Sequence, residues 1–495
     1  MNILKVLIPL LCAGSAHCAV ASEVADTVTA PFHADYEIEA AATVSSKGAH
    51  TPFWLISNRS GLGSPRTNTG FVRGAIHAGG TIAPRWSWSG GVDLVGSWRS
   101  ESPFLVRELY GAARYRDFEL TVGSRLEDDR LVDMKLSSGD LLFSGNALPI
   151  PQIHLSMPDY LNIPWLNNWL GFKAYFSLGT FTDGKWQRDF VATGALYYKD
   201  VRYHSKGLRI RIGQADRSPV TFEGGLEMAA QFGGKIMIGD SVVKKMPSSL
   251  KDVISHVIIP TGGGGSDLPG EQSNVLGNHV GEWSARLNWS APADFKVSAY
   301  YLHFFEDHSM MFFDYVWHDG LWGLEVTLPA NPFVNKFVYE YLGFKDQSGP
   351  VYWDHTPSIP EQVSGTDNYY NHYLYGGWQN RGMGIGNPLV LSPLWNANRT
   401  IGFQCNRILS HHFGLSGSPT GEIDWRILAS YTRGWGTYGS PYRDVLRNFN
   451  LLAEISYAPR RLSGWSATIA GAMDRGGMIG QSNGLMLSIK KTGIL

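Results

Sequence analysis

The strongest constraint on this chain is the alternation of apolar and polar residues over many short stretches. In residues 85–99, RWSWSGGVDLVGSWR, one parity holds Trp86, Trp88, Val92, Leu94 and Trp98, and the other holds arginine, serine and aspartate. Side chains of a β-strand point alternately to its two faces, so this stretch has one apolar and one polar face. Aromatic residues near both ends of the apolar face are typical of a strand that crosses a membrane.

The same alternation recurs in residues 117–125, 424–435, 464–474 and 485–490. No segment after the N-terminus offers a run of about 18 apolar residues, so a membrane protein with this sequence must be a barrel. A soluble β-sandwich or β-helix also alternates, but no fixed short repeat is present. With 17 to 19 candidate strands in the sequence, we expect an all-β fold, a transmembrane antiparallel β-barrel of about 18 strands.

The N-terminus predicts export. Residues 1–21 have a positive start, a short apolar core and a small-residue cleavage site, as in a secretory signal peptide. We expect residues 22–34 to form a periplasmic segment and residues 35–495 to form the barrel. Two of the three cysteines lie in the leader, which leaves Cys405 without an intrachain partner. The net charge of −1 and the lack of a basic run predict no nucleic-acid partner.

Three inserts interrupt the alternation, at about 127–168, 235–278 and 345–398. The first contains Pro149, Pro151, Pro158 and Pro164, and prolines are excluded from the middle of a sheet. We therefore predict a lumenal or periplasmic fold-back over residues 143–164 that helps to plug the barrel. In the second insert, the apolar spacing predicts an amphipathic helix over 248–259, packed at the periplasmic end or on another helix.

Several polar clusters invite a catalytic or metal-binding interpretation, and none is persuasive. The stretch HFFEDH, residues 303–308, places His303 and His308 on opposite faces of a strand, as do the adjacent His411 and His412. His154 shares a strand face with Ser156, but no acidic partner is evident in sequence. We expect no catalytic residues, no metal and no cofactor, and hence no enzyme.

Two loops combine aromatic and polar residues densely. One includes Tyr315 and Trp317, and the other includes Tyr369, Tyr370, His372, Tyr373, Trp378 and Arg381. Sugars present C–H faces and hydroxyl groups together, so flat aromatic surfaces beside hydrogen-bonding groups suit them. The same aromatics equally suit an interfacial belt or the packing of a plug. Both interpretations stay open from the sequence, and the residues of these two loops are candidates for polysaccharide binding.

Three stretches carry a resemblance to a known family. TPFWLISNRSG (51–61), LSSGDLLFSGNALPIPQIHL (136–155) and DNYYNHYLYGGWQNRGMGIGNPL (367–389) resemble the capsule assembly Wzi family of outer-membrane proteins, in its Bacteroidetes form. The resemblance implies an 18-stranded barrel in a Gram-negative outer membrane, with a small periplasmic helical part and long loops filling the lumen. It also implies outer-membrane lipids and the barrel-assembly machinery as partners. In one departure, the chain ends on Leu495 and not on the aromatic residue common in such barrels.

The function that the resemblance implies is non-catalytic. It is the binding of capsular or other surface polysaccharide, and help in assembling or anchoring that polysaccharide at the cell surface. The alternative is a porin, a diffusion channel for sugars or other small solutes. The two differ in whether the loops fill the lumen.

Overall fold

The computed structural model describes residues 32–46, 50–214, 216–248, 277–292, 294–306, 319–347, 352–353, 363–364 and 367–495. Several predictions fall outside the described residues. They are the signal peptide (1–21), residues 22–31 of the periplasmic segment, the helix over 248–259 except its first residue, and the candidates Tyr315 and Trp317.

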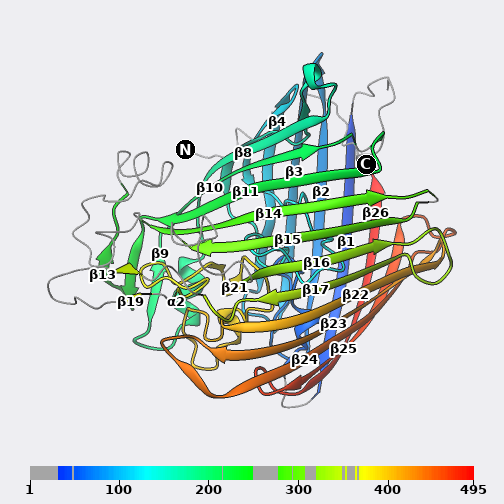
Figure 1. Cartoon of the computed structure of the whole chain (residues 1–495). Helices are drawn as coiled ribbons and strands as arrows, with labels where there is room; N and C mark the ends of the chain where they lie inside the picture. Colours follow the sequence, from blue (N-terminus) through cyan, green and yellow to red (C-terminus); the bar gives the residue numbers. More distant parts are fainter. Residues whose placement is uncertain are drawn as a thin grey trace.

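The described strands form one large antiparallel sheet that closes on itself, because β1 pairs with both β2 and β26 (Figure 1). Its members are β1 (His33–Ser45), β2 (Thr69–Ala83), β3 (Trp86–Trp98), β4 (Phe104–Tyr115), β5 (Phe118–Ser124), β6 (Gln152–Ser156), β7 (Leu161–Asn162), β8 (Leu170–Thr180), β10 (Arg202–Ile212), β11 (Val220–Phe232), β14 (Asn278–Ser290), β15 (Lys296–Glu306), β16 (Gly320–Thr327), β17 (Lys336–Gly343), β22 (Ile408–Thr420), β23 (Ile423–Gly436), β24 (Pro441–Tyr457), β25 (Trp465–Gly476) and β26 (Ser482–Ile494).

The barrel has 18 wall strands. The sheet contains 19 segments, but β6 and β7 both pair with β8 and are two pieces of one wall strand. Closure satisfies the backbone hydrogen bonds of every wall strand and leaves no free edge, which a membrane requires. The predicted all-β barrel of about 18 strands is confirmed.

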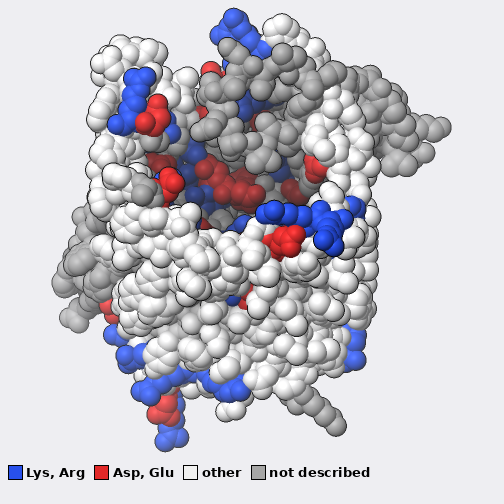
Figure 2. Space-filling model, turned by 90° about the vertical axis from the view of Figure 1, so that its right-hand side faces the viewer, with Lys and Arg blue, Asp and Glu red and all other residues white. Residues whose placement is uncertain are grey.

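The outer face of the wall is apolar. Trp86 and Trp98, at opposite ends of β3, are each 46% exposed, whereas Asp93 between them is 0% exposed and faces the lumen. Other exposed aromatics stand near the ends of wall strands, among them Phe104, Tyr115, Phe118, Trp169, Trp289, Trp322, Tyr457 and Trp465. In Figure 2 a band of the outer wall directly below the hollow is free of charge, and Lys and Arg residues lie beneath this band. The predicted lipid-facing parity of β3 is confirmed.

The two ends of the barrel differ in their connections. At the end where β1 begins and β26 ends, the turn end, neighbouring strands are joined by two to eight residues. At the opposite end, the loop end, the connections include residues 46–68, 125–151, 181–201, 233–277 and 344–407. Outer-membrane barrels have short periplasmic turns and long extracellular loops, so we assign the loop end to the cell exterior.

The small elements of the described chain gather at the loop end, on the left in Figure 1. Strands β9 (Leu196–Lys199), β12 (Lys235–Ile238) and β13 (Ser241–Lys245) form a three-stranded sheet, and β18 (Tyr352–Trp353) pairs with β19 (Val363–Ser364). The α-helix α2 (Gly184–Phe190) lies next to β9. This helix is therefore at the loop end, whereas the helix predicted over 248–259 lies almost wholly outside the described residues.

No helix in the described part of the chain is long and apolar enough to span a membrane.

The first insert is shorter than predicted. Residues 143–151 enter the lumen as expected, but residues 152–156 form β6, which pairs with β5 and β8 in the wall. Ile153 and Leu155 are about half exposed on the outer face. The prediction that the prolines exclude this segment from the wall was wrong, because Pro151 and Pro158 flank β6 and do not interrupt it. With only Ile153 and Leu155 facing outward, the strand is also too short to show the alternation of apolar and polar residues in the sequence.

Three lumenal segments, 50–64, 131–151 and 367–407, together form what we call the plug. Each carries one of the stretches that resemble the Wzi family. They include the 3-10 turns η1 (Phe53–Leu55) and η4 (Pro393–Trp395) and the hairpin β20 (Gln379–Asn380) with β21 (Met383–Gly384). Their apolar side chains join inward residues of the wall in one buried cluster. The core of this protein is thus inside the barrel, at its loop half.

Candidate functional site

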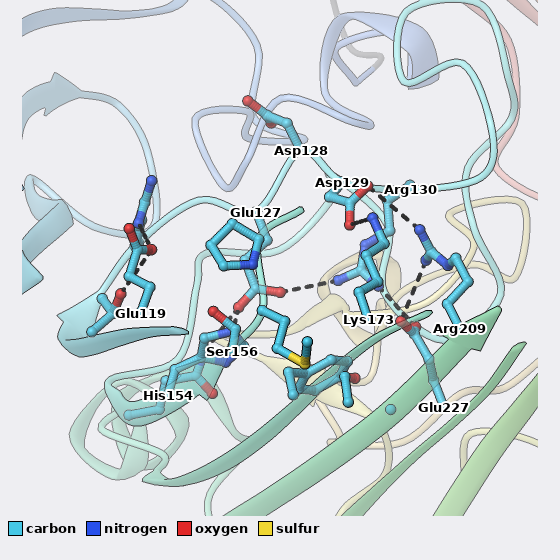
Figure 3. A pocket seen from close by; sticks show the side chains of 18 of the residues that line it. Glu119, Glu127, Asp128, Asp129, Arg130, His154, Ser156, Lys173, Arg209 and Glu227 are labelled. Carbon is cyan, nitrogen blue, oxygen red and sulfur yellow. Dashed lines mark hydrogen bonds and ion pairs between the residues drawn. The ribbon is translucent and has the colours of Figure 1, made fainter. Parts of the chain in front are cut away.

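The turn half of the lumen is polar and open. Figure 2 faces the side on which β26 ends and shows a hollow in which acidic and basic side chains gather. One part of it is a pocket of about 290 Å³, which we call the vestibule pocket. In Figure 3, Glu227 lies between two arginines, at 2.9 Å from Arg130 and 3.5 Å from Arg209, and Asp129 pairs with Lys173. The charges of this pocket largely neutralise one another.

The His154 environment in this pocket does not form a catalytic triad. Nδ1 of His154 lies 2.7 Å from Ser177 Oγ, and the same nitrogen is 3.7 Å from Glu127. A triad needs the acid and the nucleophile on different ring nitrogens. Ser156, which shares a strand face with His154, makes neither contact. The described residues contain no group of three or more His, Cys, Asp or Glu placed to hold a metal ion.

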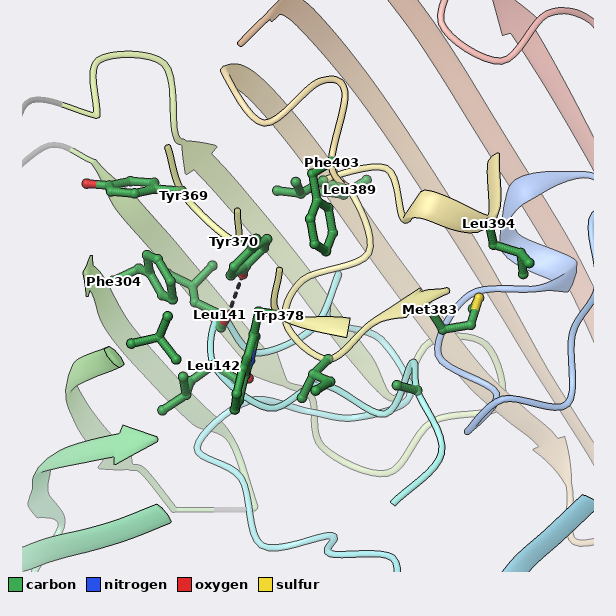
Figure 4. Packing of buried hydrophobic residues seen from close by; sticks show 14 of the residues in the cluster. Leu141, Leu142, Phe304, Tyr369, Tyr370, Trp378, Met383, Leu389, Leu394 and Phe403 are labelled. Carbon is green, nitrogen blue, oxygen red and sulfur yellow. Dashed lines mark hydrogen bonds between the residues drawn. The ribbon is translucent and has the colours of Figure 1, made fainter. Parts of the chain in front are cut away.

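The plug contains all six of the described candidates for polysaccharide binding, and three of them are buried. Tyr369, Tyr370 and Trp378 are each 0% exposed. The Tyr370 hydroxyl donates to the carbonyl of Leu141, and Trp378 Nε1 donates to the carbonyl of Leu142 at 2.8 Å (Figure 4). A ring without exposed surface cannot stack on a sugar. Tyr370 and Trp378 instead hold two plug segments together, and Tyr369 packs edge-on against Phe304 of the wall.

The neighbouring candidates are closer to the surface. Tyr373 is 58% exposed, and its ring stacks on the half-buried His372 with 4.9 Å between centroids. Burial, followed by the nearby His279, lowers the pKa of His372 to about 4, so its ring is neutral at neutral pH. The pair offers one exposed aromatic surface at the loop end.

Arg381 occupies an unusual backbone position. It forms with Gly382 the two-residue turn of the hairpin β20–β21, and both residues have positive φ, 52° and 75°. Such turns favour Asn or Gly at the first position, so an arginine there goes against the usual residue preference of the turn. Its backbone N–H donates to Asp183 Oδ2 at 3.0 Å, which ties the turn to the start of α2. Residues that break local rules cluster at functional sites.

Gly382 lets the turn approach α2 closely. A Cβ atom at this position would come within 2.5 Å of the Trp186 ring. Trp186 in turn stacks on Phe190, one helical turn later, with 4.7 Å between centroids and 14° between planes. The turn and the helix therefore form one surface.

This surface is one wall of an open groove of about 330 Å³ at the loop end, which we call the outer groove. Its apolar part is made of Trp186, the half-buried Phe190 and Phe104, which is 59% exposed. Its basic residues are Arg66, Lys185, Arg381 and Arg399. The groove thus combines aromatic faces with hydrogen-bonding cations.

Basic groups exceed acidic groups in the outer groove. Arg66 pairs with Glu101 at 2.9 Å and Lys185 pairs with Asp189 at 2.8 Å. Arg399 is held by backbone carbonyls, among them that of Phe190 at 2.6 Å. Within the described residues, the Arg381 guanidinium forms no ion pair, and burial lowers its pKa, opposed in part by Asp183. The excess favours an anionic ligand.

Among the predicted residues that the structure describes, only Arg381 lines the outer groove. Sequence reasoning missed Phe104, Trp186, Phe190 and Arg399, although residues 181–190, FTDGKWQRDF, held a signal. This stretch breaks the alternation of the wall strands and places two aromatics four residues apart, on one side of a helical turn.

Together, the closed wall, the apolar outer face and the long loops define an outer-membrane β-barrel. The solved structure of Wzi, an outer-membrane protein of Escherichia coli involved in group 1 capsule assembly and described as a carbohydrate-binding β-barrel, is similar to this chain. The likeness covers 92% of this chain and 83% of that one, with 12% identity and a TM-score of 0.54.

Two further structures are OccAB4 of Acinetobacter baumannii, with 10% identity, 94% and 98% coverage and a TM-score of 0.48, and OccK3 of Pseudomonas aeruginosa, with 10% identity, 94% and 96% coverage and a TM-score of 0.46. No family model and no curated protein matches the sequence.

Proposed function

We propose that this protein binds an anionic capsular or other surface polysaccharide through the outer groove and helps to assemble or anchor it at the cell surface, without catalysis. The observation that carries this proposal is the groove itself, which Phe104, Phe190 and Arg381 line together. Aromatic faces suit the C–H faces of sugars, and a guanidinium can grip a carboxylate in two places. The likeness to a carbohydrate-binding barrel supports the same proposal.

A polymer suits a site of this kind because it makes many weak contacts at once. One aromatic contact contributes about 1 kcal/mol, so a single substitution weakens binding only several-fold. Tyr373 extends the exposed aromatic surface of the loop end and stays a candidate for an additional contact. Tyr370 and Trp378 are poor tests of binding, because replacing them would disturb the plug.

The test compares a groove variant with a matched variant at the other end of the barrel. Phe190→Ala with Arg381→Gln removes one ring and one cation from the groove. Phe333→Ala with Arg217→Gln removes the same groups from exposed positions near the turn end. Binding of acidic surface polysaccharide purified from the producing strain is measured with the detergent-solubilised proteins, and retained polysaccharide is measured on cells.

We expect the groove variant to bind at least tenfold more weakly and to retain less polysaccharide, while the turn-end variant behaves like the wild type. Equal binding by both variants, with both correctly folded, would refute a role for the groove.

The second candidate function is diffusion of sugars or other small solutes through the barrel. The charged hollow at the turn half favours it (Figure 2). The plug opposes it, because its buried core occupies the loop half of the lumen. Single-molecule conductance in a planar bilayer separates the two functions, since a steady open conductance of the wild-type protein would favour the channel.

A further inference from the structure

A second cavity lies inside the barrel, between plug residues 51–64 and the wall strands β1 to β4, β23 and β26. This cavity, which we call the inner chamber, has a volume of about 280 Å³. Five basic residues line it, Arg59, Arg73, Arg107, Arg426 and Lys490, against a single acidic lining residue, Glu39. It therefore differs from the vestibule pocket, where acidic and basic residues balance.

The carboxylates around the inner chamber are shared between cations. Asp93 accepts from Arg73 at 2.8 Å and from Arg107 at 2.7 Å. Glu454 in the same way accepts from Arg59 at 3.0 Å and from Arg426 at 2.8 Å. With Glu37, which pairs with Lys490 at 3.1 Å, and Glu39, four carboxylates face five cations. The cations of the chamber are left with one positive charge in excess.

Two of these arginines also hold unused donors. Nε of Arg59 and Nε of Arg107 are buried and have no acceptor among the described residues. A buried donor without an acceptor costs about 1 to 3 kcal/mol, and more when the group is charged. Burial, opposed in part by Glu454 and reinforced by Arg426, lowers the pKa of Arg59. A bound anion would balance the excess positive charge of the chamber.

The remaining lining suits a hydroxylated ligand. Thr43, Thr51, Ser64, Ser97 and Asn58 supply hydroxyl and amide groups around the basic centre. The chamber is also far larger than one water molecule, whose share of liquid volume is about 30 Å³. A small inorganic anion would fill only a small part of this volume.

We propose that the inner chamber is a binding site for a small organic anion, namely a carboxylate-bearing sugar unit held by Arg59 and Arg107. This goes beyond the proposed function, because the ligand is a single sugar unit and the chamber shares no lining residue with the outer groove.

A constriction joins the inner chamber to the outer groove. A small cavity of about 30 Å³ shares Leu62, Ser97 and Ser100 with the chamber, and shares Trp186 and Arg381 with the groove. Leu62, Val95, Leu105 and Leu148 form a separate apolar cluster at this point. The chamber therefore lies directly behind the groove, across a narrow apolar neck. Its ligand can come from two sources, the terminal sugar of a polymer or a free sugar acid.

The test uses the purified full-length protein in detergent, at constant ionic strength, with glucuronate as the probe and sulfate as the comparison. Arg59→Gln and Arg107→Gln are made separately, because each leaves the shared carboxylate paired with its other arginine. Arg217→Gln, at an exposed turn-end position, is the matched control. Heat-dependent gel mobility confirms that each variant is folded, and calorimetry measures binding.

We expect one glucuronate site in the wild type and in Arg217→Gln, with affinity reduced roughly tenfold or more in either chamber variant. No glucuronate binding by the wild type, or unchanged binding by both folded chamber variants, would overturn the proposal. Equal affinity for sulfate would show that the chamber recognises only the negative charge of a ligand, and would overturn the proposal that the ligand is a sugar.

The groove variant separates this proposal from the proposed function. Phe190→Ala with Arg381→Gln should lose polysaccharide binding and keep glucuronate binding. Loss of both would place the glucuronate in the groove and refute the chamber as its site.

Discussion

The two halves of the lumen use carboxylates in opposite ways. In the plug half, Glu340 is 0% exposed and accepts hydrogen bonds from uncharged groups, Ser137 Oγ at 2.5 Å, Ser138 N at 2.7 Å and Tyr300 OH at 2.6 Å. In the turn half, the side chain of Asp129 is 65% exposed and pairs with cations. Buried carboxylates thus fix the plug in one position, whereas exposed ion pairs line a wet surface that tolerates change.

The difference follows from hydration. A carboxylate inside the plug has lost its water and is stable only where several donors replace it, which specifies one arrangement of the plug against the wall. An ion pair at a wet surface contributes little, because water competes for both partners. We therefore expect substitutions in the plug half to have large effects and substitutions in the turn half to have small ones.

Trp378→Ala should have the largest effect. The ring is fully buried, contacts Phe143 edge-on at 5.8 Å and donates to Leu142, so its loss leaves a cavity and an unpaired carbonyl. We expect the plug to lose about 4 kcal/mol. Hydrogen exchange of the amides in 141–143 measures the free energy of plug opening, and bilayer conductance should rise.

Trp165→Ala is the matched control, because that ring is 82% exposed near the turn end. If both variants exchange at the same rate, the plug is not held by its apolar core.

Glu340→Ala should come second. The substitution leaves two hydroxyl groups and one backbone N–H without their acceptor, and we expect a loss of about 3 kcal/mol. Glu340→Gln keeps the volume and one acceptor oxygen and should lose less. The same exchange measurement on Ser137 and Ser138 checks this order, and a glutamine variant as unstable as the alanine variant would contradict it.

The alternation of Trp86 to Trp98 was enough to predict the barrel, because a wall strand meets lipid on one face and the lumen on the other along its whole length. The plug has no such period. Tyr370 and Tyr373 lie in the same sequence stretch, yet one is fully buried and the other is mostly exposed. Contacts with residues far away in sequence, such as those of Tyr370 with Leu141 and Phe304, determine which of the two is buried.

The stretches that carried the family resemblance turned out to be the plug segments. They predicted long loops inside the lumen, and the structure confirms this. They did not predict the outer groove, because eleven of its twelve lining residues lie outside those stretches, in α2, at the start of β4 and in the loops before β2, β4, α2 and β22. Arg381 belongs to both, because it ends a plug hairpin and enters the groove.

Gly382→Ala should have a moderate effect, confined to the groove. Its φ of 75° disfavours a side chain, and the new Cβ atom would press on Trp186. We expect a cost of about 1 to 2 kcal/mol and weaker polysaccharide binding, without a change in plug opening. Gly194→Ala is the matched control, because Gly194 has a φ of 83° but no atom within 4 Å of its Cβ position. Equal loss of binding in both variants would indicate backbone strain alone, and would remove the Trp186 contact from the explanation.

Asp129→Asn should have the smallest effect, and it directly tests the expectation for the solvent-exposed ion pairs of the turn half. Asp129 pairs with Lys173 and with Arg209, the latter at 3.4 Å, but Arg209 keeps Glu227 as a second partner at 3.5 Å. Because water replaces the lost contacts, we expect a change below about 1 kcal/mol that shrinks further in high salt. Urea unfolding at two salt concentrations measures both quantities. A loss as large as that of Glu340→Ala, insensitive to salt, would mean that the turn half is as dry and as rigid as the plug, and the distinction between the two halves would fall.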